Sequence, residues 1–305
     1  MLRPLLVLSR QQRVKTLVTR LPLTRGIVTR FVAGETIDDA VACSRSLVAS
    51  GLLVSLDHLG EDTTTFSRAE QTTAEYLRLL QRLADEGLAG SVEVSLKLSA
   101  VGQFLPENGE RTALRNARTI CAAASDVGTT VTVDMEGHLA TASTLVLVDK
   151  LREGYPRVGT VVQAALRRTE TDVDRMATPG RRVRLCKGAY EMPPDVAYPS
   201  AHEVALSYVR CLRTLVDGPG YPMIATHDPR LIAIAERLVT GRGFGSYEFQ
   251  MLYGVRPAEQ QRLAAAGHQV RVYVPYGSDW YGYLMRRLAE RPANLAFFLR
   301  ALWPR

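Results

Sequence analysis

The amino-acid sequence predicts an α/β fold, a (βα)8 TIM-type barrel with N-terminal helices and a final helix over its mouth. From residue 51 onward, eight apolar segments rich in β-branched residues alternate with amphipathic helical segments. The length of 305 residues is ordinary for one such barrel. An open doubly wound sheet would need an early phosphate-binding loop, whereas the Gly-rich stretch 241–245 precedes a strand.

The first segment is basic, and we expect it to form helices that pack on the barrel. Val14, Leu17, Val18 and Leu21 follow the spacing of one helix face, and the pattern repeats over 27–32. Residues 1–34 carry seven basic groups and no acidic group. Contact with an anionic membrane and an import peptide are open alternatives. We expect an N-terminal helical segment over 1–49 and a catalytic barrel over 50–305.

The expected strands follow in order along the chain. They are 51–60, 91–100, 129–137, 158–166, 182–190, 222–228, 247–252 and 269–277. Helical periodicity over 68–88 and 201–216 is typical of the segments between them, and a last helix at about 279–291 follows the eighth strand.

Polar residues near the C-terminal ends of these strands are the candidates for a site, because barrels of this class carry their chemistry there. In strand order they are Asp57, His58, Glu61, Lys97, Asp134, Glu136, Gln163, Arg184, Lys187, Tyr190, Thr226, His227, Asp228, Glu248, Gln250, Tyr273 and Tyr276. Their accumulation on one rim is a stronger signal than any one of them, since barrel interiors also contain buried polar pairs.

The composition excludes several classes of protein. Residues 35–305 contain 31 basic and 31 acidic groups, which argues against a nucleic-acid-binding face. No run of about 18 apolar residues occurs, so no membrane-spanning helix is expected. The four cysteines lack CxxC spacing and the five histidines lack HxxxH spacing. We therefore expect reduced thiols, a cytoplasmic location and no metal site.

The last helix carries an unusual pair of arginines. Tyr283, Arg286, Arg287 and Glu290 stand at i, i+3, i+4 and i+7, which is one stripe of a helix. Two guanidinium groups on one face suit a single carboxylate, which can accept from both. A solvated charged face is the ordinary alternative, but the position directly after the eighth strand favours a role over the barrel mouth.

Six segments carry a family resemblance. They are SLKLSA, VDMEG, VRLCKGAY, ATHD, YEFQMLYGV and RVYVPYG…YLMRRLAERPAN, in this order over about residues 50–298. With them the sequence resembles the monofunctional bacterial proline dehydrogenases, FAD enzymes built on a distorted (βα)8 barrel. It departs from the common pattern at Cys186, Asp228 and Glu191, where valine, asparagine and an aromatic residue are usual.

The resemblance implies hydride transfer from C5 of L-proline to N5 of FAD. The product would be Δ1-pyrroline-5-carboxylate, in the first step of proline catabolism to glutamate, with electrons passed on to a membrane quinone. A separate pyrroline-5-carboxylate dehydrogenase would be a partner. The basic first segment would give the enzyme peripheral contact with the inner face of the cell membrane.

The resemblance also implies roles for individual residues. Asp134 and Arg184 would be catalytic, with Asp134 at the floor of the site and Arg184 near flavin N5, and Glu61 would be a gate that pairs with Arg286 on closure. The substrate-binding residues would be Lys97, Arg286, Arg287, Tyr273, Tyr283, Leu252 and Tyr190. The FAD-binding residues would be Met135, Gln163, Lys187, Gly188, Ala189, Thr226, His227 and Glu290.

Other functions stay open at this point. A 4-hydroxyproline dehydrogenase is one, although Tyr273 would crowd the ring carbon that carries the hydroxyl. A Schiff-base aldolase that uses Lys97 or Lys187 is another. A membrane- or nucleic-acid-binding module acting through the basic first segment would leave the rim residues unexplained.

Overall fold

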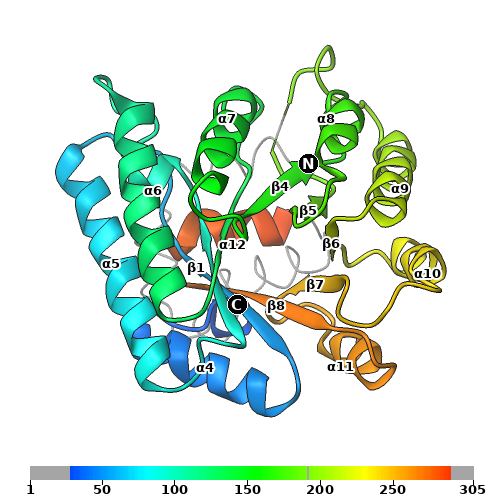
Figure 1. Ribbon diagram of the computed structural model, residues 1–305, viewed down its shortest axis with the longest axis horizontal. Helices are drawn as coiled ribbons and strands as arrows, with labels where there is room; N and C mark the ends of the chain where they lie inside the picture. Colours follow the sequence, from blue (N-terminus) through cyan, green and yellow to red (C-terminus); the bar gives the residue numbers. More distant parts are fainter. Residues whose placement is uncertain (1–27, 191, 290–305) are drawn as a thin grey trace, which may run out of the picture.

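The structure is a computed structural model that describes residues 28–190 and 192–289. Eight parallel strands close into a barrel in sequence order, from β1 to β8, and β8 pairs with β1 (Figure 1). The predicted barrel is confirmed, and each strand lies at its expected place. The strands are β1 (Leu53–His58), β2 (Val92–Leu96), β3 (Val131–Val133), β4 (Gly159–Gln163), β5 (Arg182–Cys186), β6 (Tyr221–Ala225), β7 (Glu248–Leu252) and β8 (Val270–Tyr276).

Helices surround the strands, and a last helix crosses the barrel. Figure 1 shows α5 to α11 as an outer ring and α12, in red, across the ring of strands. The helices are α4 (Ile37–Ala49), α5 (Phe66–Asp85), η1 (Ser99–Val101), α6 (Gly109–Asp126), α7 (Thr141–Arg152), α8 (Thr169–Met176), α9 (Ala201–Asp217), α10 (Pro229–Leu238), α11 (Pro257–Ala265) and α12 (Trp280–Ala289).

The described part of the N-terminal segment is tied to the barrel. A capping box starts α4: Thr36 Oγ1 accepts from the Asp39 N–H at 3.1 Å, and Asp39 Oδ2 accepts from the Thr36 N–H at 3.0 Å. Phe31 and Val32 are buried against α12. The predicted face from Val14 to Leu21 lies outside the described residues, and the domain boundary at residue 49 stays a prediction.

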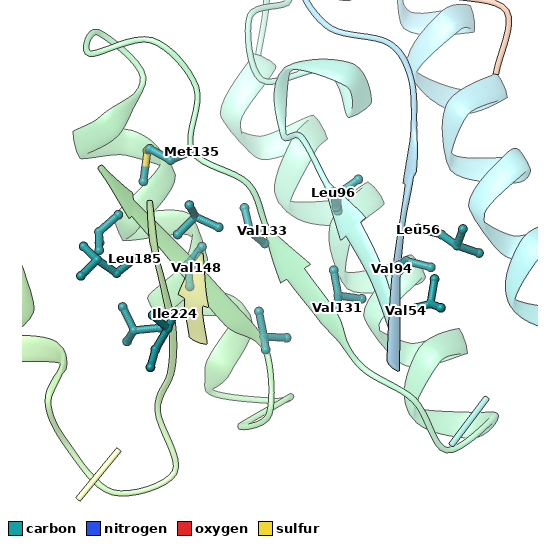
Figure 2. Packing of buried hydrophobic residues seen from close by; sticks show 14 of the residues in the cluster. Val54, Leu56, Val94, Leu96, Val131, Val133, Met135, Val148, Leu185 and Ile224 are labelled. Atoms are coloured by element: carbon teal, nitrogen blue, oxygen red, sulfur yellow. The ribbon is translucent and has the colours of Figure 1, made fainter. Parts of the chain in front are cut away.

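The apolar core lies between the strands and the outer helices. Residues that face outward on the strands, such as Val54, Leu56, Val94 and Leu96, are fully buried there. Figure 2 shows part of this cluster, in which valines and leucines of successive strands pack together. Burial of one such side chain stabilises a fold by about 1.5–3 kcal/mol, so this layer holds the helices on the barrel.

The inside of the barrel is polar. Glu93 Oε1 accepts from the hydroxyls of Ser55 and Thr132, each at 3.1 Å, and Glu93 Oε2 accepts from Arg182 at 2.7 Å. Burial alone would raise the pKa of Glu93, but Arg182 and Arg271 nearby lower it to about 2. Because successive residues of a strand face opposite ways, the same strands supply both this ionic interior and the apolar outer core.

We searched the described residues for membrane-spanning helices, metal-binding groups and disulfides. Among them, no helix is long and apolar enough to cross a membrane, and no group of acidic residues, histidines and cysteines could hold a metal ion. All four cysteines fall in the described part, and all four are free thiols.

Candidate active site

A cavity of about 720 Å³ opens at the C-terminal ends of the strands. Every strand, or the residues directly after it, contributes to its lining, and Phe31 from the segment before α4 and Tyr283 from α12 line it as well. A volume of this size is typical of a site for a small molecule or a cofactor. The rim that the sequence predicts as the site is therefore hollow.

Asp134 lies at the floor of the cavity between two donors. Arg184 Nη1 donates to Asp134 Oδ1 at 2.6 Å, and the Tyr273 hydroxyl donates to Asp134 Oδ2 at 2.7 Å. The guanidinium of Arg184 also lies over the Tyr273 ring, 5.3 Å from its centroid. Arg184 is only 4 % exposed, so this charged pair is held in a largely water-free environment.

Lys97 enters the cavity as a fixed cation. Its Nζ donates to both carboxylate oxygens of Asp57, each at 2.7 Å. Burial would lower the pKa of Lys97, but the charges of Asp57 and Asp134 raise it above the ordinary value. Lys97 is therefore protonated. In this form it can bind an anionic group, but it cannot act as an amine nucleophile.

Lys187 and His227 occupy the opposite side of the barrel. Lys187 Nζ lies 2.7 Å from Asp228 Oδ2, and Asp228 also caps α10 by accepting from the Arg230 N–H at 3.0 Å. His227 Nε2 accepts from the Leu252 N–H at 2.8 Å, so the ring is held by β7. These contacts fix two of the predicted FAD-binding residues at the cavity wall.

The lining carries more positive than negative charge. Among the described residues of the lining, the cations are Arg30, Lys97, Arg184, Lys187 and Arg256, and the anions are Asp57, Asp134 and Asp228. A concave surface with an excess of cations favours anionic ligands, such as an amino-acid carboxylate or a diphosphate.

Most of the predicted site residues with described side chains come together in this cavity. Those that line it are Lys97, Asp134, Met135, Arg184, Lys187, Gly188, Ala189, Tyr190, Thr226, His227, Leu252, Tyr273 and Tyr283.

Two predicted residues with described side chains do not line the cavity. Glu61 lies outside the lining and makes polar contacts of its own. Gln163 lies just behind it, with Nε2 bonded to the Glu136 carbonyl at 2.8 Å and Oε1 buried without a hydrogen-bond partner in the described structure.

The conformation of Gly188 explains how Gln163 stays close to the cavity. Gly188 has φ +105°, and a Cβ there would stand 3.0 Å from Gln163 Oε1. A larger residue would therefore strain the backbone and fill the space in front of that oxygen.

Several other rim candidates have structural roles instead. His58 packs against Tyr76 and Tyr276 outside the cavity. Glu136 accepts from the N–H and hydroxyl of Ser99, at 3.2 and 2.5 Å. The expectation that Glu248 lies at the C-terminal end of its strand is wrong, because β7 begins with this residue.

Three predicted residues come from the end of the last helix that the sequence predicts over about 279–291. The backbone of Arg286 and Arg287 continues α12 one turn after Tyr283, while their side chains lie outside the described part. Glu290 and the family departure at Glu191 also lie outside it. The carboxylate clamp thus stays a prediction.

Four charged residues of the described lining were not among the predicted site residues: Arg30, Asp57, Asp228 and Arg256. Asp57 was noted only as a rim residue, and its pairing with Lys97 follows from the adjacency of β1 and β2. Arg256 has the left-handed φ of 51° before Pro257, and its Nη1 donates to the His227 carbonyl at 2.8 Å. An arginine between a glycine-containing turn and a proline is the signal in the sequence that could have suggested it.

Comparisons with known proteins identify relatives of the chain. The family model described as proline dehydrogenase matches residues 40–300. Proline dehydrogenase 1 of Bacillus subtilis is 37% identical over 304 residues, which cover 99% of each chain. Proline dehydrogenase of Deinococcus radiodurans is 39% identical over 279 residues, covering 90% of this chain and 89% of that protein.

The fold is also found in a larger solved protein. The crystal structure of proline utilization A from Bdellovibrio bacteriovorus, inactivated by N-propargylglycine, superposes with a TM-score of 0.79. The match covers 88% of this chain and 33% of that chain, at 24% identity, and supports the barrel fold.

Proposed function

The chain belongs to the proline dehydrogenase family, and on that premise we propose how its cavity oxidises L-proline with FAD. The protein is an oxidoreductase that acts on proline. The observation that supports the proposal most is the excess of cations around the cavity, above a floor formed by Asp134, Arg184 and Tyr273. When bound, FAD supplies the acceptor for the hydride that leaves C5 of L-proline, and the product is Δ1-pyrroline-5-carboxylate.

The cavity wall fits a flavin. The buried Oε1 of Gln163 has no hydrogen-bond partner in the described structure, and it suits an N–H donor of a flavin ring. Lys187 lies at the wall as a cation for a diphosphate. Met135, Gly188, Ala189, Thr226 and His227 would complete this half of the site, with Glu290 as the further contact that the family resemblance implies.

The other half of the cavity would hold the amino acid. Lys97 is a protonated cation with one N–H left beyond the two that Asp57 accepts, and Arg286 and Arg287 would add two guanidinium groups. Three cations around one carboxylate compensate for the water that it loses on binding. Tyr190, Leu252, Tyr273 and Tyr283 would surround the apolar ring.

Asp134, Arg184 and Tyr273 would act below the reacting atoms. Their mutual hydrogen bonds fix the cation of Arg184 at the floor, where it would stabilise negative charge on a reduced ligand. Closure of α12 over the mouth, with Glu61 as the gate that pairs with Arg286, would exclude water from the transfer.

The two alternative enzymes fit the site less well. A Schiff-base aldolase needs a neutral amine, but Lys97 is protonated and Lys187 is paired with Asp228. A 4-hydroxyproline dehydrogenase needs room beside the ring, and the hydrogen bond from Tyr273 to Asp134 holds the tyrosine in place. L-Proline is therefore the proposed substrate.

Anaerobic spectroscopy tests the proposal. The purified protein should carry flavin, and an excess of L-proline without oxygen should bleach its visible absorbance and release Δ1-pyrroline-5-carboxylate. Arg287→Met should raise the proline KM by about 100-fold or more while flavin stays bound, because a charge-assisted pair is lost. A protein that binds no added FAD, or whose flavin L-proline leaves oxidised, would contradict the function.

We also propose a membrane quinone as the electron acceptor and a separate pyrroline-5-carboxylate dehydrogenase as the enzyme that takes the product. The seven basic groups within residues 1–34 would place the protein on an anionic bilayer as a peripheral protein. Deletion of residues 1–27, which carry six of these basic groups and leave the cavity residues Arg30 and Phe31 in place, should abolish sedimentation with anionic liposomes and leave flavin reduction by proline unchanged. Equal sedimentation of both proteins would rule out this role for the segment.

A further inference from the structure

The guanidinium of Arg184 has a protein acceptor for each of its five N–H groups. Nη1 donates to Ser95 Oγ at 2.9 Å and to Asp134 Oδ1 at 2.6 Å. Nη2 donates to Ser55 Oγ and to Glu93 Oε1, each at 3.3 Å, and Nε donates to Gln250 Oε1. With an acceptor for each of its five donors, the side chain is held from every side in the described structure.

Three of these five acceptors are neutral. Gln250, Ser55 and Ser95 satisfy donors without adding negative charge at the cavity floor. The acceptor Glu93 is shared, because Arg182 lies 2.7 Å from its Oε2 and Arg271 lies 3.8 Å from its Oε1. The neutral acceptors thus help to fix the position of the Arg184 cation, while Asp134 and the shared Glu93 supply the compensating negative charge.

Gln250 joins Arg184 to a second layer deeper in the barrel. Its Nε2 donates to Glu248 Oε1, and Glu248 receives Nε and Nη2 of Arg271 at 2.8 and 3.1 Å. Gln250 is 3 % exposed and Glu248 is fully buried. The chain of contacts runs Arg184, Gln250, Glu248, Arg271, Glu93 and back to Arg184, so movement of Arg184 would disturb contacts on β2, β5, β7 and β8.

We propose that Gln250, with Ser55 and Ser95, is a positioning residue that holds the Arg184 cation at the floor of the cavity. This inference rests on the proposed function, in which a flavin binds above that cation. A cation fixed there stabilises the reduced, electron-rich flavin, so looser positioning makes the bound flavin harder to reduce.

The test measures the reduction potential of the bound flavin together with kcat and KM for L-proline. Gln250→Met keeps the size of the side chain and removes its hydrogen bonds. It should lower the equilibrium constant for two-electron reduction of the bound flavin at least tenfold. This corresponds to a reduction potential that is ~30 mV more negative. The value of kcat should fall more than KM rises. The double variant Ser55→Ala/Ser95→Ala acts on the other side of the guanidinium and should shift the potential in the same direction.

Two control experiments distinguish the positioning of Arg184 by Gln250 from a general effect of the substitutions on the barrel. Thr160→Val alters a buried strand residue whose hydroxyl has no hydrogen-bond partner in the described structure, and it should leave the potential unchanged. In an Arg184→Lys background, Gln250→Met should cause no further shift, because the two residues act as one unit. A wild-type potential in both test variants, or an equal shift with and without Arg184, would overturn the inference. Failure of L-proline to bleach the wild-type flavin would instead contradict the proposed function itself.

Discussion

Lys97 and Asp57 form an ion pair between the neighbouring strands β1 and β2, in which the Lys97 Nζ lies 2.7 Å from each carboxylate oxygen of Asp57. Both side chains are buried, and both line the cavity. Breaking such a pair leaves one charge without a partner in a medium of low dielectric, whereas removing both charges together is far less costly.

Lys97→Met should therefore lower the free energy of unfolding by about 3–5 kcal/mol and weaken proline binding. The double variant Asp57→Asn/Lys97→Met should regain most of the stability but not the proline affinity. Chemical denaturation measures the first quantity, and the proline KM measures the second. If Lys97→Met were as stable as the wild type, the pair would not be the buried ion pair described above.

Tyr273→Phe removes the hydroxyl that donates to Asp134 and keeps the aromatic ring. The buried Asp134 oxygen then lacks a donor, which costs about 1–3 kcal/mol and should lower kcat/KM about 5- to 150-fold. Steady-state kinetics with L-proline checks this change, and flavin content serves as the control for the fold. An unchanged kcat/KM would show that Arg184 alone holds Asp134 in place.

Glu136 gives the protein a specific dependence of stability on pH. Burial raises the pKa of Glu136 from 4.5 to about 7, and the bonds from Ser99 oppose this only in part. The folded state thus holds the proton more tightly than the unfolded state, so stability falls as the pH rises from about 4.5 to about 7. Glu136→Gln should remove this contribution of ~3 kcal/mol, since each pKa unit corresponds to 1.36 kcal/mol.

Urea unfolding at pH 5 and pH 8 measures this effect for both proteins. The substitution should stabilise the protein at pH 8 relative to pH 5, because the neutral amide replaces a buried carboxylate. An equal effect of Glu136→Gln at both pH values would show that the carboxyl does not titrate in this window.

Lys187→Met should weaken FAD binding about tenfold, since a cation at the cavity wall is lost and a charge-assisted contact contributes about 1.5 kcal/mol or more. Titration of the flavin-free protein with FAD, followed by flavin fluorescence, gives the dissociation constant. Lys150→Met is the matched control, because Lys150 is an exposed lysine in the last turn of α7, outside the cavity lining. Equal affinities for the two variants would remove Lys187 from the flavin site.

The sequence predicts the barrel well because the apolar patterns of both its strands and its helices are regular. Strands of alternating or continuous apolar residues and helices such as 201–216 leave little ambiguity, and the C-terminal rim then follows from the topology. Pairings across the barrel are different. The contacts of Arg184 with Ser95, Gln250 and Glu93 join strands that are distant in sequence, and only closure of the barrel brings them together.

Positions at the ends of strands were also hard to predict. Glu248 and Gln250 are two residues apart and face the same interior, but Glu248 lies one layer deeper, against Arg271. The expected strand 247–252 agrees with β7, and Glu248 was placed wrongly because it begins this strand and so lies at the end away from the rim.

The central claim is that L-proline lies between Lys97 and α12, above Asp134. A crystal structure of the flavin-loaded protein with cyclopentanecarboxylate, a cyclic acid without the ring nitrogen, tests it most directly. The carboxylate should lie within hydrogen-bonding distance of Lys97 and of the guanidinium groups of Arg286 and Arg287, with the ring over the flavin. A ligand bound elsewhere, or a cavity without flavin, would contradict the claim.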